Sequence, residues 1–183
     1  IYPNKEVTST ILDTYPAIKA AEVHATNFYT VLARVVEREP TSLWCQEGNS
    51  VCSYMDEDGV VYAPAAVGSE ELYVRYQGSA KGSGLPKQYL TLEQFHNLAA
   101  LVGALSQSQP GNPLRSAMVD ANDDVHTQFA NGFVLMFALR DAGGDVFERF
   151  NLALRAEPFV GQSLGTFEYL DLRWGDSLYY KHK

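Results

Sequence analysis

Short segments in which apolar and polar residues alternate dominate the chain after Pro40, and this pattern limits the fold more than any other feature. Period-two alternation bounded by turn residues is typical of half-buried strands. The predicted strands are Ser42–Gln46, Val51–Met55, Val60–Tyr62, Leu72–Tyr76, Leu114–Val119, Val125–Phe129, Phe133–Leu139, Phe167–Trp174 and Ser177–Lys181. Two helical patterns interrupt them. We therefore predict an α+β fold, an antiparallel sheet with two helices packed on it.

The two helical patterns have recognisable starts. Thr91 and Gln94 have the spacing of a capping box, and the residues after them form one apolar stripe. Its members are Phe95, Leu98, Ala99, Val102 and Leu105. The second helix is expected to begin at Asp145–Glu148, with Phe147, Phe150 and Leu154 facing inward.

The first 40 residues have a different pattern. Asn4 is a suitable cap for a helix that runs to about Thr14 and stops before Tyr15-Pro16. A strand over 21–25, a turn at Thr26-Asn27 and a strand over 28–37 follow. These elements are too few for a complete domain, so we expect residues 1–40 to be the back half of one and Pro40 to mark the boundary.

Composition excludes some classes of partner. The net charge is −8 with no cluster of Lys or Arg, which predicts neither a nucleic-acid footprint nor a membrane-surface patch. No stretch approaches the roughly 18 apolar residues of a membrane span. The chain begins at Ile1-Tyr2-Pro3 without an initiator Met, so we expect it to be a fragment of a longer protein. A membrane anchor could then precede it.

Cys45 and Cys52 are the two cysteines of the chain. A four-residue loop over 47–50 would place them opposite each other on antiparallel strands, at the separation that a disulfide needs. A two-thiol metal site is the alternative, but the spacing is wrong for a zinc knuckle and no His lies nearby. We favour the disulfide, which implies an oxidising compartment.

The candidate reactive motifs favour structural roles. The glycine-rich segment 78–84 lacks the ending of a phosphate-binding loop and is predicted to be a surface loop. Residues 120–124 resemble the start of a calcium loop, but Val125 stands where glycine is required, so a capped turn is preferred. The four histidines lie far apart in sequence. We therefore predict no catalytic residue, no metal site and no cofactor.

The closing segment carries the most promising binding surface. Along 167–174, odd positions share one strand face and even positions share the other. The strand Ser177–Lys181 follows, and we expect it at a sheet edge, where unpaired backbone groups accept a strand from another chain. In the alternative, Lys181, His182 and Lys183 protect this edge and Tyr179 or Tyr180 packs inward.

Four short motifs are spread along the chain, at residues 14–19, 36–44, 54–62 and 169–181. Together they resemble motifs of the FtsQ/DivIB family of bacterial cell-division proteins. Residues 36–44 (VEREPTSLW) resemble the segment that joins the two domains of that family, and residues 54–62 (YMDEDGVVY) resemble the hairpin after it. Residues 169–181 (YLDLRWGDSLYYK) resemble the closing strands, and residues 14–19 (TYPAIK) resemble the end of the small POTRA domain. The cysteine pair and the long segment 63–86 depart from the family pattern.

The resemblance implies a POTRA remnant over residues 1–40 and a β-domain over 41–183. It further implies a non-catalytic scaffold on the extracytoplasmic side of the cell membrane, held by one transmembrane helix upstream of this chain. FtsB/FtsL-like division proteins are the implied partners, and a partner strand adds to the last strand of the β-domain. The residues implicated are Arg173, Trp174, Ser177, Leu178, Tyr179, Tyr180 and Lys181.

Alternatives remain for the residues and for the function. Tyr179, Tyr180 and Trp174 are the expected anchors, and Arg173 and Lys181 would steer an acidic partner. Arg173 is equally suited to an ion pair with Asp171 that holds the hairpin together. The rival functions are a module that binds a small ligand or cell-wall glycan in an aromatic-lined pocket, and an enzyme of a type that no motif reveals.

Overall fold

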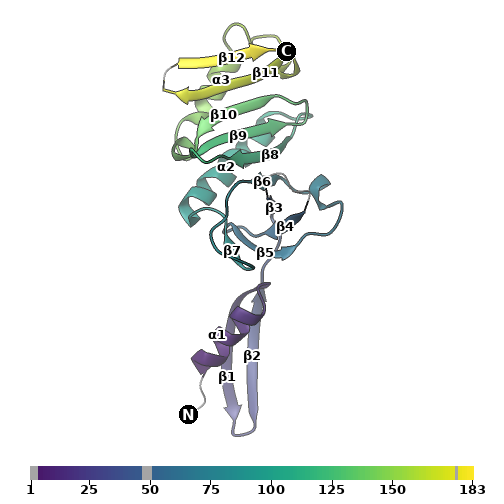
Figure 1. Ribbon diagram of the computed structural model, residues 1–183, viewed down its shortest axis with the longest axis vertical. Coiled ribbons are helices and arrows are strands. Elements are labelled where there is room, and N and C mark those ends of the chain that lie inside the picture. The colour runs from purple at the N-terminus through teal and green to yellow at the C-terminus, as the bar shows by residue number, and fades with distance from the viewer. Residues whose placement is uncertain (1–3, 47–50, 176) are drawn as a thin grey trace.

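The computed structural model describes residues 4–46, 51–175 and 177–183 and has an α+β fold (Figure 1). The described chain forms a two-stranded sheet at the N-terminal end and a ten-stranded sheet beyond it. Three α-helices accompany these sheets in the described ranges. The molecule is elongated, with the small sheet at one end of the long axis and the C-terminal strands at the other (Figure 1).

The N-terminal unit consists of α1 (Asn4–Thr14), β1 (Ile18–Asn27) and β2 (Thr30–Glu37). Asn4 was predicted to cap the helix from the position before it, but it is the first helical residue. The helix ends at Thr14, as predicted. The two strands pair antiparallel over most of their length. Val23 is the single buried residue that α1, β1 and β2 contain, so this unit has almost no core of its own.

The turn between β1 and β2 lies at Phe28-Tyr29, two residues later than predicted. The side chain of Asn27 explains the difference, because its Oδ1 accepts a hydrogen bond from the backbone N–H of Tyr29 at 2.9 Å. Asn side chains stabilise turns in this way. Thr26 and Asn27 therefore remain in the strand.

The strands of the large sheet lie in the order β12-β11-β10-β9-β8-β6-β3-β4-β5-β7. Their bounds are β3 (Ser42–Cys45), β4 (Cys52–Met55), β5 (Val60–Pro64), β6 (Arg75–Gln77), β7 (Lys87–Gln88), β8 (Leu114–Val119), β9 (Asp124–Phe129), β10 (Val134–Ala138), β11 (Phe167–Trp174) and β12 (Ser177–His182). The predicted antiparallel sheet is found in part: most neighbouring strands are antiparallel, but β3–β6, β6–β8 and β10–β11 are parallel pairs, so the sheet is mixed. Parallel neighbours require long crossover connections, and the helices and loops before β6, β8 and β11 supply them.

The strand predicted at Leu72–Tyr76 starts later than expected, at Arg75. A 3₁₀ helix, η1 (Ser69–Glu71), precedes it. The backbone N–H groups of Leu72 and Tyr73 both donate to the carbonyl of Ser69, so they are not available to a sheet. Alternation in sequence was misleading here because local turn hydrogen bonds satisfy the backbone instead.

Two helices, α2 (Leu92–Ser108) and α3 (Val146–Leu154), cover one face of the large sheet (Figure 1). α2 packs against β8, and α3 packs against β11. The predicted capping box is confirmed, since Thr91 and Gln94 each bond to the backbone of the other. The buried stripe of α2 consists of Phe95, Leu98, Leu101, Val102 and Leu105. Short 3₁₀ segments, η2 (Leu139–Asp141) and η3 (Leu164–Thr166), complete the connections.

Ion pairs join the N-terminal unit to the large sheet. Arg38 reaches both parts, with its Nη1 2.5 Å from the buried Asp56 and its Nε 3.2 Å from the carbonyl of Pro16. The Nζ of Lys19 lies 2.7 Å from the Oε1 of Glu57 and 2.7 Å from the Oδ2 of Asp58. Both acidic residues belong to the turn between β4 and β5. Hydrogen bonds to Asp58 and Glu57 raise the pKa of Lys19. The turn at 56–59 thus holds the N-terminal unit in place.

Candidate protein-binding edge

β12 forms one edge of the large sheet, as predicted. It pairs with β11 on one side, and no strand of the described chain pairs with it on the other. All six of its residues are exposed. The opposite edge, β7, is only two residues long. It is also partly covered, because Lys81 forms an isolated β-bridge with Gln88. Short, covered edges resist pairing with other chains, whereas a long exposed edge invites it.

The direction of each backbone group along β12 follows from the ladder with β11. The N–H of Lys183 donates to the carbonyl of Thr166 at 3.0 Å, so Lys183 faces β11. Backbone groups alternate in direction along an antiparallel strand. Tyr179 and Lys181 therefore also face β11, while the N–H and C=O groups of Leu178 and Tyr180 point away from the sheet. These outward groups are the ones that an added strand would bond.

The side chains of β12 divide between two faces. Tyr180 lies on the helix-covered face, where its ring is 5.5 Å from Phe159 and 6.2 Å from Phe167. It is still 43% exposed, so the alternative of inward packing applies to only part of its surface. Tyr179 is paired with Asp171 across the ladder and is 56% exposed. By alternation it lies on the helix-free face.

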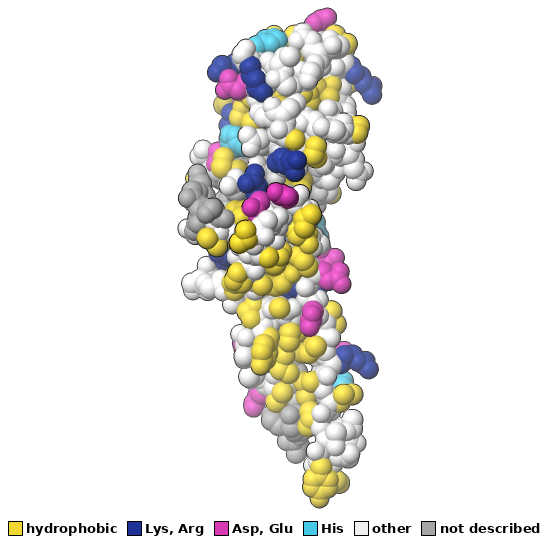
Figure 2. All heavy atoms as spheres, turned by 90° about the vertical axis from the view of Figure 1, so that its right-hand side faces the viewer, with side chains coloured by type: hydrophobic (Ala, Val, Ile, Leu, Met, Phe, Trp, Pro, Cys, Tyr) yellow, Lys and Arg dark blue, Asp and Glu magenta, His cyan; other side chains and the backbone are white. Residues whose placement is uncertain are grey.

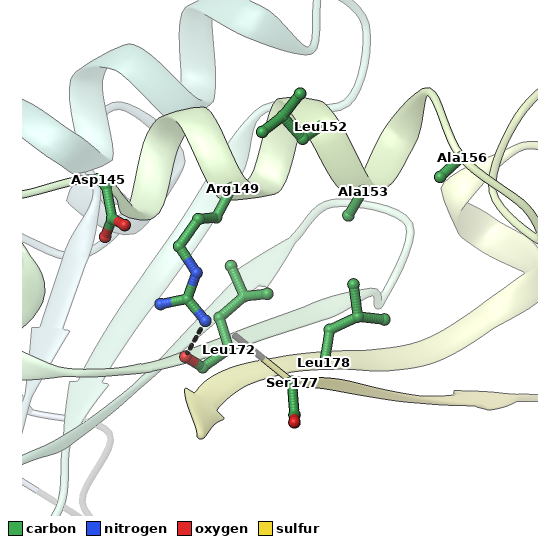
Figure 3. A pocket seen from close by; sticks show the side chains of 8 residues that line it. All are labelled: Asp145, Arg149, Leu152, Ala153, Ala156, Leu172, Ser177 and Leu178. Carbon is green, nitrogen blue, oxygen red and sulfur yellow. Dashed lines mark hydrogen bonds between the residues drawn. The ribbon is translucent and has the colours of Figure 1, made fainter. Parts of the chain in front are cut away.

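A groove of about 330 Å³ separates α3 from β12 (Figure 3). Its walls are Asp145, Arg149, Leu152, Ala153, Ala156, Leu172, Ser177 and Leu178. Figure 3 shows Arg149 extending from α3 toward the strands, where its guanidinium donates to the carbonyl of Leu172 at 2.8 Å and to that of Gly175. The sequence predicted Ser177 and Leu178 but missed the α3 residues.

A cluster of polar side chains supports the hairpin from the helix-free side. Asp171 is buried, and Arg173 contacts it through Nη2 at 2.7 Å and contacts Asp124 through Nη1 at 2.6 Å. The indole of Trp174 donates to Asp171 at 3.2 Å. Burial alone would raise the pKa of Asp171, but the hydrogen bonds from Arg173 and Trp174 prevail and lower it.

Both cations that were expected to steer a partner have acidic neighbours within the sheet. Arg173 is held by two carboxylates within its own sheet, and hydrogen bonds to Asp171 and Asp124 raise its pKa. Lys181 pairs with Glu168 at 2.6 Å. The ion pair between Arg173 and Asp171 that was considered from the sequence is thus present in the structure. Trp174 remains 61% exposed, which leaves its ring accessible beside the edge.

The two cysteines form a disulfide, as favoured from the sequence. Cys45 and Cys52 are directly opposed on β3 and β4, with Cα atoms 4.2 Å apart. Six places in the strand order separate β3 from β12, so the bond stabilises the first hairpin of the large sheet and has no direct part in the edge. The loop predicted over 47–50 lies outside the described residues.

The other motifs have structural roles in this chain. Asp120 caps its turn by accepting hydrogen bonds from the N–H groups of Asn122 and Asp124, as predicted. His96 contacts Asp58 at 3.3 Å, and His126 contacts Asp120 at 3.3 Å. No group of three or more potential metal ligands occurs in the ranges that the structure describes.

The helices of the described ranges are too short or too polar to cross a membrane. Comparison with known proteins gives no match, either to a protein-family model or to a curated protein sequence.

Proposed function

We propose that this chain is the extracytoplasmic part of a cell-division scaffold of the FtsQ/DivIB type, with a POTRA remnant at residues 1–40. It binds an FtsB/FtsL-like partner, which adds a strand to β12. The observation that carries the proposal is the open edge at β12, six exposed residues long with one side unpaired in the described chain. The proposal also rests on the sequence motifs at 36–44, 54–62 and 169–181.

Strand addition would use backbone and side chains separately. The outward N–H and C=O groups of Leu178 and Tyr180 give affinity without regard to partner sequence. Specificity comes from the side chains on either face. Alternate partner residues would enter the groove beside Arg149 or lie on the helix-free face beside Tyr179.

Two further hollows in the described part of the chain favour a scaffold over a glycan-binding module. A sugar would stack on an exposed aromatic face. Trp44 lines a hollow of about 370 Å³, but it is largely buried and the Nζ of Lys87 lies 3.6 Å from the centre of its ring. The hollow beside Phe159 is lined mainly by polar and small residues. Neither hollow offers a free aromatic platform.

The test is a titration with a peptide from the extracytoplasmic segment of an FtsB-like protein of the same genome. Tyr179→Ala should weaken binding by at least ~2 kcal/mol, the usual threshold for an interface hot spot. The tyrosine makes no ring contact among those found in the described chain, so its loss should leave the fold intact. Thermal unfolding of the free variant verifies this.

A proline tests the backbone directly. Tyr180→Pro removes an outward N–H that β11 does not use, and it should abolish binding. Tyr180→Ala is the matched control, because it loses the same ring and keeps the N–H. If the folded proline variant binds the peptide as tightly as the alanine variant does, strand addition at β12 is wrong.

A further inference from the structure

The tip of the β1–β2 hairpin carries two aromatic side chains that touch nothing. Phe28 is 101% exposed and Tyr29 is 99% exposed. Each aromatic side chain buries roughly 150–250 Å² when it is covered, so two adjacent exposed rings form a sizeable apolar surface. Val31 and Leu32, next to them on β2, are exposed as well. An apolar end therefore projects from the molecule (Figure 2).

The charge pattern sets this tip apart from the rest of the chain. The nine residues from Ala25 to Ala33 carry no charged side chain. His24 and Arg34 mark the two limits of this uncharged segment, one on each strand. A tip without charges, bounded by residues that can remain in water, matches the change from apolar to polar at a membrane surface.

The shape of the tip favours a bilayer over a protein partner. A stable protein interface needs about 800 Å² from each side, with complementary relief. The two aromatic side chains at the end of the narrow hairpin supply about 300–500 Å² between them, and Val31 and Leu32 are already partly covered. Insertion into a lipid interface needs no complementary surface, and the amphipathic ring of Tyr is suited to the headgroup level.

The position of the tip agrees with this assignment. The start of α1 and the turn at Phe28-Tyr29 lie at the same end of the long axis (Figure 1). We propose that Phe28 and Tyr29 insert into the interfacial layer of a lipid bilayer and orient the protein on the membrane. This inference rests on the proposed function, because the FtsQ/DivIB resemblance implies a membrane anchor upstream of this chain.

The test uses the whole chain displayed on vesicles of phosphatidylcholine and phosphatidylglycerol, through an N-terminal His tag and a nickel-chelating lipid. An environment-sensitive fluorophore is attached at Thr30→Cys, while the native disulfide leaves no other free thiol. On insertion its emission should rise, and nitroxide-labelled lipids should quench it. The same fluorophore at Ser177→Cys, at the far end of the molecule, should show neither effect.

The matched variant is Phe28→Ser combined with Tyr29→Ser. Its insertion equilibrium constant should fall by about tenfold or more, because most of the buried apolar area is gone. An unchanged emission on vesicles, or an equal rise in the double variant, would overturn the proposal; a protein partner would then be the better occupant. The measurement needs no partner peptide, so its failure is distinguishable from failure of strand addition at β12.

Discussion

Asp171 connects Arg173 and Trp174 at the end of β11, and Asp171→Asn tests how much these contacts stabilise the fold. The carboxylate accepts four hydrogen bonds. Oδ1 accepts from the backbone N–H and the Nε of Arg173, at 3.0 Å and 2.9 Å. Oδ2 accepts from the Nη2 of Arg173 at 2.7 Å and from the indole of Trp174 at 3.2 Å.

The substitution keeps one acceptor and inverts the other. Asparagine retains an oxygen for the first pair of donors, but its NH₂ group would face the guanidinium and the indole, which are also donors. The bond from the Arg173 guanidinium, worth about 1.5–3 kcal/mol, is lost, and so is the bond from the indole of Trp174, worth about 0.5–1.5 kcal/mol because that side chain is largely exposed to water. We therefore expect the free energy of unfolding to fall by about 2–4 kcal/mol.

Urea unfolding at several pH values measures this loss and its origin. The pKa of Asp171 is lowered in the folded protein, so its contribution is complete above the ordinary carboxyl value of about 4 and disappears as the pH falls through the lowered value. The difference between wild type and variant should thus shrink on acidification below about pH 4. A difference under about 0.5 kcal/mol at neutral pH would refute the assigned role of the cluster.

Two further substitutions test the β4–β5 and β3–β4 hairpins of the large sheet, in that order. Gly59→Ala should destabilise the fold by about 2–4 kcal/mol in thermal unfolding, because Gly59 has φ +75° and a Cβ there would lie 2.7 Å from the ring of Phe95; an unchanged midpoint would contradict this packing. Replacing Cys45 and Cys52 together by Ser should cost about 2–3 kcal/mol in urea, as expected for closing a loop of this length. Reductant should destabilise the wild type by a similar amount and leave the double variant unaffected.

Local patterns predicted the elements whose stability is decided locally. The capping box at Thr91 and Gln94 starts α2, and the capped turn at Asp120 forms as expected. The facing cysteines also followed from local spacing, because a hairpin fixes which residues oppose each other. The pairing of β12 with β11 was predictable in the same sense, since the two strands are close neighbours in the sequence.

Contacts between distant segments were not predictable in this way. The parallel pairing of β10 with β11 depends on a crossover through α3, and alternation within a strand does not reveal its neighbour's direction. The groove was missed for the same reason, because Arg149 reaches it from a helix more than twenty residues before β12. Asn27 moved the first turn through a single side-chain hydrogen bond, which pattern alone does not weigh.

The long axis of the molecule places the aromatic hairpin tip and β12 at opposite poles (Figure 1). Ligands bound at the two ends would not collide, and residues so far apart usually have additive effects on the free energy. Occupancy at one pole should then leave affinity at the other unchanged, unless the turn at 56–59 that joins the two sheets shifts. The protein would act as a spacer of fixed length, holding whatever binds β12 at a set height above whatever the tip touches.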